Sequence, residues 1–169
     1  MTLTDDQLKA IHYIKNNSAI MACPGSGKTT ILINKMIVCH EKMKKHNGFI
    51  ALSFTKKSSY DLKFRFNKIG NNSSNNFFGT IYDFFLNEII RPFLSNIWQG
   101  NSKELEVVKI LDNLESQHFV NDPSRKKISL KDIEDENGYQ GLFNDGKILI
   151  NTINALALLV IKKSSSCRR

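Results

Sequence analysis

The chain has 169 residues, 41% of them hydrophobic and 24% charged, with a formal net charge of +8. This composition is typical of one soluble globular domain and excludes a collagen, a coiled-coil rod and a disordered tail. The longest apolar stretch, residues 155–161, is far shorter than a membrane span, and the first residues lack a secretory signal pattern. Three scattered cysteines argue against a disulfide framework and a zinc site, so we expect a cytoplasmic protein.

The positive charge is concentrated in one part of the chain. Residues 35–68 hold nine lysines and arginines and two acidic residues, a net charge of +7, whereas the remainder carries +1. A concentrated basic region attracts nucleic acids, because binding releases counterions condensed on the phosphates. A lysine-coated helix that keeps the protein soluble would show the same pattern. Charge alone therefore leaves nucleic-acid binding open.

The first elements alternate between helix and strand. Thr4, with Gln7 three residues later, forms a capping box that predicts a helix ending near Asn16. The periodicity of the apolar residues then predicts a buried strand over 18–22, a helix over 29–45, a strand over 49–54 and a basic helix over 57–68. This alternation is typical of an α/β fold with a parallel sheet.

The pattern changes in the second half of the chain. Residues 70–76 are too polar to form an element and predict a loop. The next elements are predicted as a strand over 77–79 and a helix over 81–90 that Thr80 caps and Pro92 ends. Up to residue 146 we expect a mostly helical insertion without strands, with helices over 102–114 and 130–136 and a loop at 122–123. Residues 147–163 predict an apolar helix, and a polar tail follows.

The strongest motif is ACPGSGKT at residues 22–29, between a predicted strand and a predicted helix. Gly25 and Gly27 let the backbone bend so that amide groups point at the β and γ phosphates of a nucleotide. Lys28 can neutralise phosphate charge and the Thr29 hydroxyl can ligate Mg²⁺, while an alanine replaces the first glycine of the usual GxxxxGK[ST] pattern. The motif predicts a phosphate-binding loop formed by Ala22, Cys23, Pro24, Gly25, Ser26, Gly27, Lys28, Thr29 and Thr30.

Four segments in this order, LTDDQLKAI, ACPGSGKTT, ALSFTKKSSYDLKFRF and GTIYDFF, resemble the N-terminal motor domain of UvrD/Rep-type superfamily 1 DNA helicases. The resemblance covers about residues 2–91 and, more weakly, 147–163. It implies a P-loop NTPase (RecA-like) fold with an incomplete parallel sheet, and ATP and Mg²⁺ as ligands. The implied parts are 1–91 as the start of the ATP-binding motor domain, 92–146 as a helical insertion, and 147–169 as a returning helix with a polar tail.

The resemblance also implies roles for residues outside the loop. Gln7 matches the glutamine that reads the adenine edge, although it can also serve only the Thr4 capping box. Phe54 and Thr55 match a motif that meets single-stranded DNA, where a ring stacks on a base and a hydroxyl binds a phosphate. The alternatives are a core position for Phe54 and a helix cap for Thr55.

Three further positions are implied to contact DNA. Thr80 and Tyr82 fall on the next DNA-contacting motif, and Tyr82 stands where the family often has histidine. Lys56 replaces the family's usual asparagine, which adds attraction to phosphate but removes a directed amide hydrogen bond. These residues complete the implied binding path for single-stranded DNA.

One expected feature of the family is missing. Hydrolysis requires an Asp and a Glu at the end of a buried strand, and the sequence has one such pair, Asp135-Glu136, after a segment with no apolar run. We therefore expect the front part of an ATP-dependent DNA helicase that binds ATP and single-stranded DNA without turnover and needs the remainder of the motor as a partner. The alternatives are a small P-loop kinase and a non-catalytic, nucleotide-gated DNA-binding module.

Overall fold

The computed structural model describes residues 3–13, 17–44, 46–69, 75–98, 105–109, 128–135 and 138–164. The chain forms two compact units, Met1–Thr80 and Ile81–Arg169, and each has its own hydrophobic core. Helices and short parallel strands occur in both units, which confirms the expected mixture of α and β structure. The three-part division of the chain stays a prediction.

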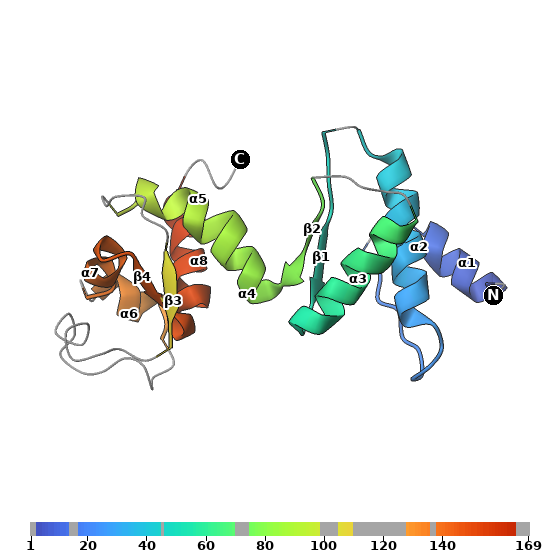
Figure 1. Ribbon diagram of the computed structural model, residues 1–169, viewed down its shortest axis with the longest axis horizontal. Coiled ribbons are helices and arrows are strands. Elements are labelled where there is room, and N and C mark those ends of the chain that lie inside the picture. Colours follow the sequence, from blue (N-terminus) through green and yellow to red (C-terminus); the bar gives the residue numbers. More distant parts are fainter. Residues whose placement is uncertain are drawn as a thin grey trace. The chain divides into compact units, whose positions relative to one another are not determined.

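The first unit is a small α/β structure (Figure 1). Its elements are α1 (Asp5–His12), α2 (Lys28–Lys42), β1 (Ile50–Ser53), α3 (Lys56–Lys68) and β2 (Phe77–Thr80). Strands β1 and β2 pair in parallel, with Ser53 in register with Thr80, and α3 is the crossover between them. The expected helix over 57–68 and strands over 49–54 and 77–79 are therefore confirmed within one or two residues.

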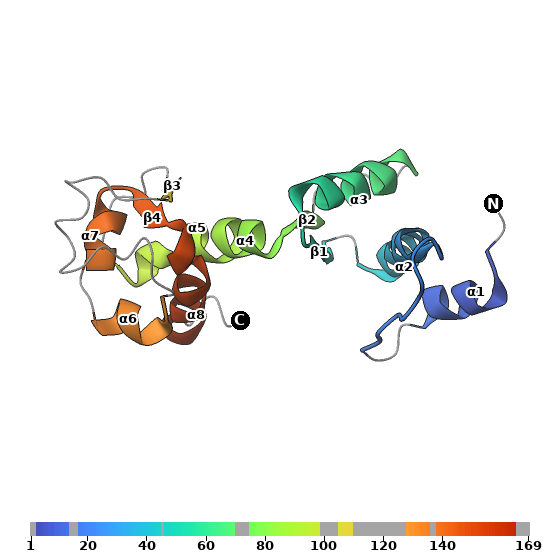
Figure 2. The same cartoon turned by 90° about the horizontal axis from the view of Figure 1, so that it is seen from below.

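The core of the first unit lies between the sheet and two helices (Figure 2). Its buried residues are Ile33 and Met36 of α2 and Leu62 and Phe66 of α3, with Phe49, Ala51 and Phe78 packed against them. The ring of Phe66 stands edge-on to that of Phe49, with centroids 5.2 Å apart. The other face of β1 stays open, because Ile50 and Leu52 are 57% and 43% exposed.

The expected buried strand at residues 18–22 is wrong. Residues 17–22 belong to no strand, every one of them is exposed, and Met21 is 95% exposed. A strand needs a neighbour whose backbone groups complete its hydrogen bonds, and the described part of the chain places no strand beside this segment. Apolar composition is therefore insufficient to form the strand here.

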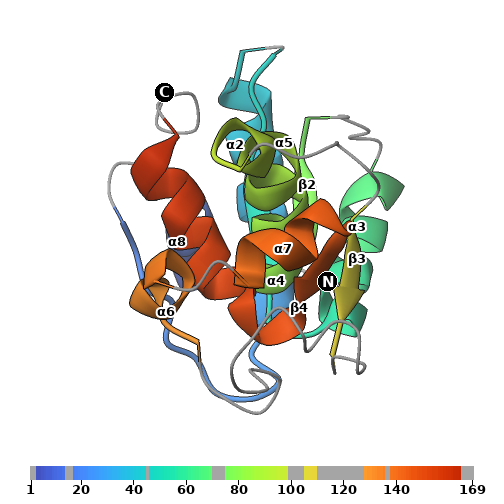
Figure 3. The same cartoon turned by 90° about the vertical axis from the view of Figure 1, so that its left-hand side faces the viewer.

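The second unit contains one apolar helix (α8, Ile153–Lys163), which lies at one side of the unit in Figure 3 and contributes six residues to its core. Its elements are α4 (Ile81–Phe84), a π-helical segment (Phe85–Ile90), α5 (Arg91–Phe93), a 3₁₀ turn (Leu94–Asn96), β3 (Glu106–Val108), α6 (Leu130–Asp135), α7 (Gly138–Asn144), β4 (Lys147–Leu149), a second 3₁₀ turn (Ile150–Thr152) and α8 (Ile153–Lys163). Helix α8 packs against the π-helical segment and α6, and Leu156, Leu159 and Val160 are fully buried. The buried residues occupy one broad side of α8, whereas Asn154, Leu158 and Ile161 on the other side are exposed.

Two expectations for this unit are wrong because short strands escape periodicity analysis. Strands β3 and β4 pair in parallel, with Val107 in register with Ile148, so the region before residue 146 does contain a strand. Residues 106–108 are therefore not helical, and the helix expected over 147–163 begins only at Ile153. Three residues are too few to show the alternation that marks a strand.

The helix that begins at Ile81 does not end at Pro92, contrary to expectation. It continues through α5 to the 3₁₀ turn that ends at Asn96. Proline lacks an amide hydrogen and its ring collides with the carbonyl group four residues earlier in an α-helix. The π-helical segment Phe85–Ile90 lies directly before α5, and its wider turn leaves more room for the proline ring.

The remaining expectations concern one helix of the second unit and segments outside the described residues. The helix expected over 130–136 is confirmed as α6, and no described helix is long and apolar enough to cross a membrane. Residues 70–74, the loop at 122–123, Glu136, the tail from 165, and most of 102–114 lie outside the described residues.

Candidate functional site

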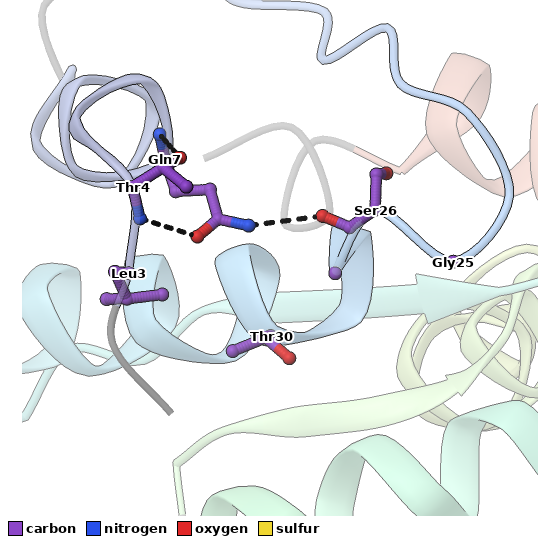
Figure 4. A pocket seen from close by; sticks show the side chains of 7 residues that line it. Leu3, Thr4, Gln7, Gly25, Ser26 and Thr30 are labelled. Carbon is purple, nitrogen blue, oxygen red and sulfur yellow. Dashed lines mark hydrogen bonds between the residues drawn. The ribbon is translucent and has the colours of Figure 1, made fainter.

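The capping box at the start of α1 is confirmed, and it reaches the glycine-rich loop (Figure 4). The backbone N–H of Thr4 donates to Gln7 Oε1 over 2.9 Å, and the backbone N–H of Gln7 donates to Thr4 Oγ1 over 3.3 Å. The same Gln7 side chain donates from Nε2 to the Ser26 carbonyl oxygen over 3.1 Å. Gln7 therefore joins the first turn of α1 to the loop, and its contact with adenine stays a prediction.

A lysine that sequence reasoning did not select fixes α1 on α2. Lys35 Nζ donates to the carbonyl oxygens of Ala10, over 2.9 Å, and of Tyr13. These carbonyl groups lie at the C-terminal end of α1, where a cation is favoured. The available signal was a lysine placed between apolar positions of α2, where Ile31, Ile33 and Met36 are buried. By holding the end of α1, Lys35 helps to position Gln7.

The backbone of the loop has the conformation that its glycines predict. Gly25 and Gly27 have φ angles of +79° and +82°, in the left-handed region that side chains with a Cβ rarely adopt. Gly27 is also the N-cap of α2, and no side chain caps that helix. The first amide groups of α2 therefore point outward, which makes this end a suitable site for an anion.

The polar groups of the loop converge on one carbonyl oxygen. The Cys23 oxygen accepts hydrogen bonds from Ser26 Oγ over 2.7 Å and from Lys28 Nζ over 2.7 Å. Lys28 Nζ also donates to the Ala22 oxygen over 2.8 Å. The loop thus holds its own lysine near the start of α2, while Thr29 is exposed beside it.

A cavity of about 300 Å³ lies between α1 and the loop (Figure 4). It is lined by Leu3, Thr4, Gln7, Gly25, Ser26, Gly27 and Thr30. Five of these residues were predicted to bind nucleotide, whereas Leu3 and Thr4 were not. The cavity thus brings the Gln7 side chain and the glycine-rich loop to one opening.

The donor set around the loop fits a magnesium ion that is carried by phosphate. No cluster of three His, Cys, Asp or Glu side chains able to hold a metal occurs in the described part of the chain. Thr29 is exposed and directly follows Lys28, and its hydroxyl is an oxygen of the kind that Mg²⁺ takes as a ligand. Because Mg²⁺ takes phosphate oxygens and water as its other ligands, one protein hydroxyl is sufficient here.

The residues predicted to meet DNA in the first unit lie at the carboxyl edge of its sheet. Phe54 directly follows β1 and is 100% exposed, so its alternative as a core residue is wrong. Thr55 caps α3 by accepting the Ser58 amide over 3.1 Å, which confirms its alternative as a helix cap. Thr80 ends β2 in register with Ser53 and is 8% exposed.

The two remaining residues of the predicted path are exposed. Lys56 is the first residue of α3. Tyr82 belongs to α4 of the second unit, where its side chain is 48% exposed. The acidic pair has no strand before it, because Asp135 is the last residue of helix α6.

Comparison with known proteins gives a family match over most of the chain. Residues 3–164 match the model of the UvrD/REP helicase N-terminal domain family. The chain is 32% identical over 153 residues to the Gabija protein GajB of Bacillus cereus (strain VD045), which covers 90% of this chain and 28% of that protein. It is 28% identical over 146 residues to a probable DNA helicase II homolog of Mycoplasma capricolum, covering 86% of this chain and 18% of the relative.

A shorter match concerns part of the chain. The ATP-dependent DNA helicase Rep of Buchnera aphidicola subsp. Schizaphis graminum is 38% identical over 69 residues, or 40% of this chain and 10% of that protein. The chain thus spans less than a third of the length of each of these three relatives. Because the family match extends over nearly all of its residues, the chain belongs to the UvrD/REP helicase N-terminal domain family.

Proposed function

We propose that the chain is the front part of the first motor domain of an ATP-dependent DNA helicase, with a RecA-like sheet that is incomplete. It binds ATP with Mg²⁺ at residues 22–30 and single-stranded DNA at the carboxyl edge of the β1–β2 sheet. The observation that carries this proposal is the loop itself. Two left-handed glycines, a lysine and an uncapped helix start lie beside a cavity of about 300 Å³.

The phosphates would bind where the loop meets α2. The amide groups that follow Gly25 and Gly27 supply hydrogen-bond donors, and Lys28 supplies positive charge. Lys28 must exchange the carbonyl oxygens of Ala22 and Cys23 for phosphate oxygens, and charge pairing favours that exchange. When bound, Mg²⁺ would neutralise the β and γ phosphates, held on the protein side by the Thr29 hydroxyl.

The adenine ring would lie next to Gln7. The amide of Gln7 uses one oxygen lone pair for the Thr4 amide and one hydrogen for the Ser26 carbonyl oxygen. A second lone pair and a second hydrogen remain on the same side chain. Gln7 can therefore donate to and accept from an adenine edge while it keeps its grip on the loop.

Single-stranded DNA would cross the edge where β1 and β2 end. Phe54 offers a fully exposed ring for stacking on a base, and Lys56 offers charge for a phosphate. Thr55 and Thr80 add hydroxyl groups at this edge, and Tyr82 of the second unit is proposed as a DNA contact in its own right. Residues 35–68, which include β1 and residues 54–56, carry a net charge of +7, and this charge favours binding of a polyanion.

The 169-residue chain binds these ligands without turnover. Asp135 of its one Asp-Glu pair ends helix α6 and does not follow a buried strand, so we do not assign this pair as the acids that activate water. The rest of a helicase motor would supply them as the partner of this chain. An ATPase assay with single-stranded DNA tests this point, because rapid turnover that Lys28→Ala abolishes would contradict it.

Nucleotide binding is tested by titrating the chain with a fluorescent ATP analogue and Mg²⁺. Lys28→Ala should weaken binding about 10- to 100-fold, the equivalent of a lost hydrogen bond to a charged group. Lys42→Ala is the matched control, because Lys42 is an exposed lysine at the other end of α2. Equal affinities for wild type and Lys28→Ala would overturn the assignment of the loop.

A further inference from the structure

Two aromatic rings stand on the outer face of α3, on the side away from the core. Tyr60 is 72% exposed and Phe64 is 58% exposed, whereas Leu62 and Phe66 of the same helix are buried. Residues four positions apart in a helix lie on the same face, so the two rings are neighbours along it. Large exposed rings in such a pair mark a surface that binds a partner.

Basic side chains occur along the whole length of α3, in addition to the two rings. Lys57 and Lys68 lie on the same face as Tyr60 and Phe64, by the 3.6-residue period. Residues 56–68 hold five basic residues and one acidic residue, Asp61. Asp61 lies on this face too and pairs with Arg65 at 2.9 Å, and residues 56–68 keep a net charge of +4 (5 − 1). A basic helix with aromatic rings on its outer face suits an anionic partner that has flat faces.

We infer that this aromatic-basic stripe of α3, formed by Lys57, Tyr60, Phe64 and Lys68, binds single-stranded nucleic acid. The bases stack on Tyr60 and Phe64, and the two lysines contact the phosphates on either side. The inference rests on the proposed function, because it extends the DNA path beyond the sheet edge. The stripe is a surface separate from the predicted contacts at Phe54, Thr55, Lys56, Thr80 and Tyr82.

The stripe on α3 directly follows the predicted DNA contacts at the end of β1. The exposed Phe54 and the cap Thr55 directly precede α3, so the stripe begins where the sheet edge ends. Lys57 and Lys68 are about 16 Å apart along the helix, at 1.5 Å per residue. At about 3.4 Å per nucleotide along one strand, this length accommodates roughly five nucleotides.

The test measures fluorescence anisotropy of a labelled oligothymidylate of about 12 nucleotides, titrated with the 169-residue chain. The double variant Tyr60→Ala, Phe64→Ala should bind about 10-fold or more weakly, as expected for the loss of two stacking rings. The double variant Tyr60→Trp, Phe64→Trp should restore wild-type affinity. Tyr13→Ala is the matched control, because Tyr13 is 48% exposed and lies outside the stripe.

Salt dependence separates the lysines from the rings. Lys57→Ala with Lys68→Ala should lower the slope of log affinity against log salt by about 1 to 2, whereas the ring variant should leave the slope unchanged. Circular dichroism should show the wild-type helix content in each variant, because all four side chains are exposed.

Each alternative outcome has a distinct meaning. If the ring variant binds like wild type while Phe54→Ala binds weakly, the stripe is overturned and the proposed DNA path stands. If wild type binds no oligonucleotide, both the stripe and the DNA half of the proposed function fail. Tighter binding of poly-aspartate than of oligothymidylate, lost in the ring variant, would assign the stripe to an acidic protein partner and overturn the inference.

Discussion

The two glycines of the phosphate loop provide a matched pair of substitutions. Gly25 and Gly27 have nearly the same φ angle, +79° and +82°, so alanine at either position has a similar backbone cost, about 1–2 kcal/mol. Their surroundings differ. A Cβ added to Gly25 meets nothing within 4 Å, whereas one added to Gly27 lies 3.2 Å from Gln7 Nε2.

The crowding at Gly27 adds a second cost. The side-chain amide of Gln7 must move away from the new methyl group, and this movement breaks or weakens the hydrogen bond from Gln7 Nε2 to the Ser26 carbonyl oxygen. Such a bond contributes about 0.5–1.5 kcal/mol. We therefore expect Gly25→Ala to weaken nucleotide binding roughly 5- to 30-fold, and Gly27→Ala to weaken it a further 2- to 10-fold.

The assay is a titration of each variant with a fluorescent ATP analogue and Mg²⁺, with inorganic triphosphate as a second ligand. The backbone cost should affect both ligands, whereas displacement of Gln7 should affect the ligand that carries adenine more. A Gly25→Ala variant that binds as weakly as Gly27→Ala, or more weakly, would refute the reasoning. So would two variants that bind like wild type.

Three other predictions concern folding rather than ligands. In Gly48→Ala the new Cβ would lie 1.9 Å from the Asn75 carbonyl oxygen, so the free energy of unfolding should fall by about 1–3 kcal/mol and the melting temperature with it. An unchanged melting temperature would contradict this close approach. Lys35→Met removes the ammonium group that holds the end of α1, so amide hydrogen exchange should become faster in α1 than in α2. Exchange rates in α1 equal to those of wild type would contradict this anchoring role. The hydrogen bond from Lys162 lowers the pKa of Glu134, so stability present above about pH 4.5 should be lost as pH falls through the lowered pKa. Glu134→Gln should flatten that part of the denaturation curve, and an identical acid limb in both proteins contradicts the pairing.

Local signals in the sequence were sufficient for the helix starts and for the loop. The Thr4–Gln7 capping box and the Thr55 cap each depend on residues three positions apart, so the chain carries the whole pattern in one short segment. The left-handed glycines follow equally from local backbone sterics. Interactions that join distant segments, such as Gln7 with Ser26 or Lys35 with Ala10, are not visible in such patterns.

Strands were harder to predict because their stability depends on partners elsewhere in the chain. Residues 18–22 have strand composition but lie exposed, with no strand beside them among the described residues, whereas the three-residue β3 forms because β4 lies beside it. The exposed ring of Phe54 shows the same limit in another way. An aromatic residue at a strand end has the same local pattern whether it is buried or faces a ligand.

The claim that residues 22–29 bind a triphosphate is tested most directly by a crystal structure of the chain with Mg²⁺ and a non-hydrolysable ATP analogue. Phosphate oxygens should lie against the amide groups that follow Gly25 and Gly27. Lys28 Nζ should leave the Ala22 and Cys23 carbonyl oxygens for a phosphate. An analogue bound elsewhere, or a loop whose Lys28 keeps both carbonyl contacts beside a bound nucleotide, would contradict triphosphate binding by residues 22–29.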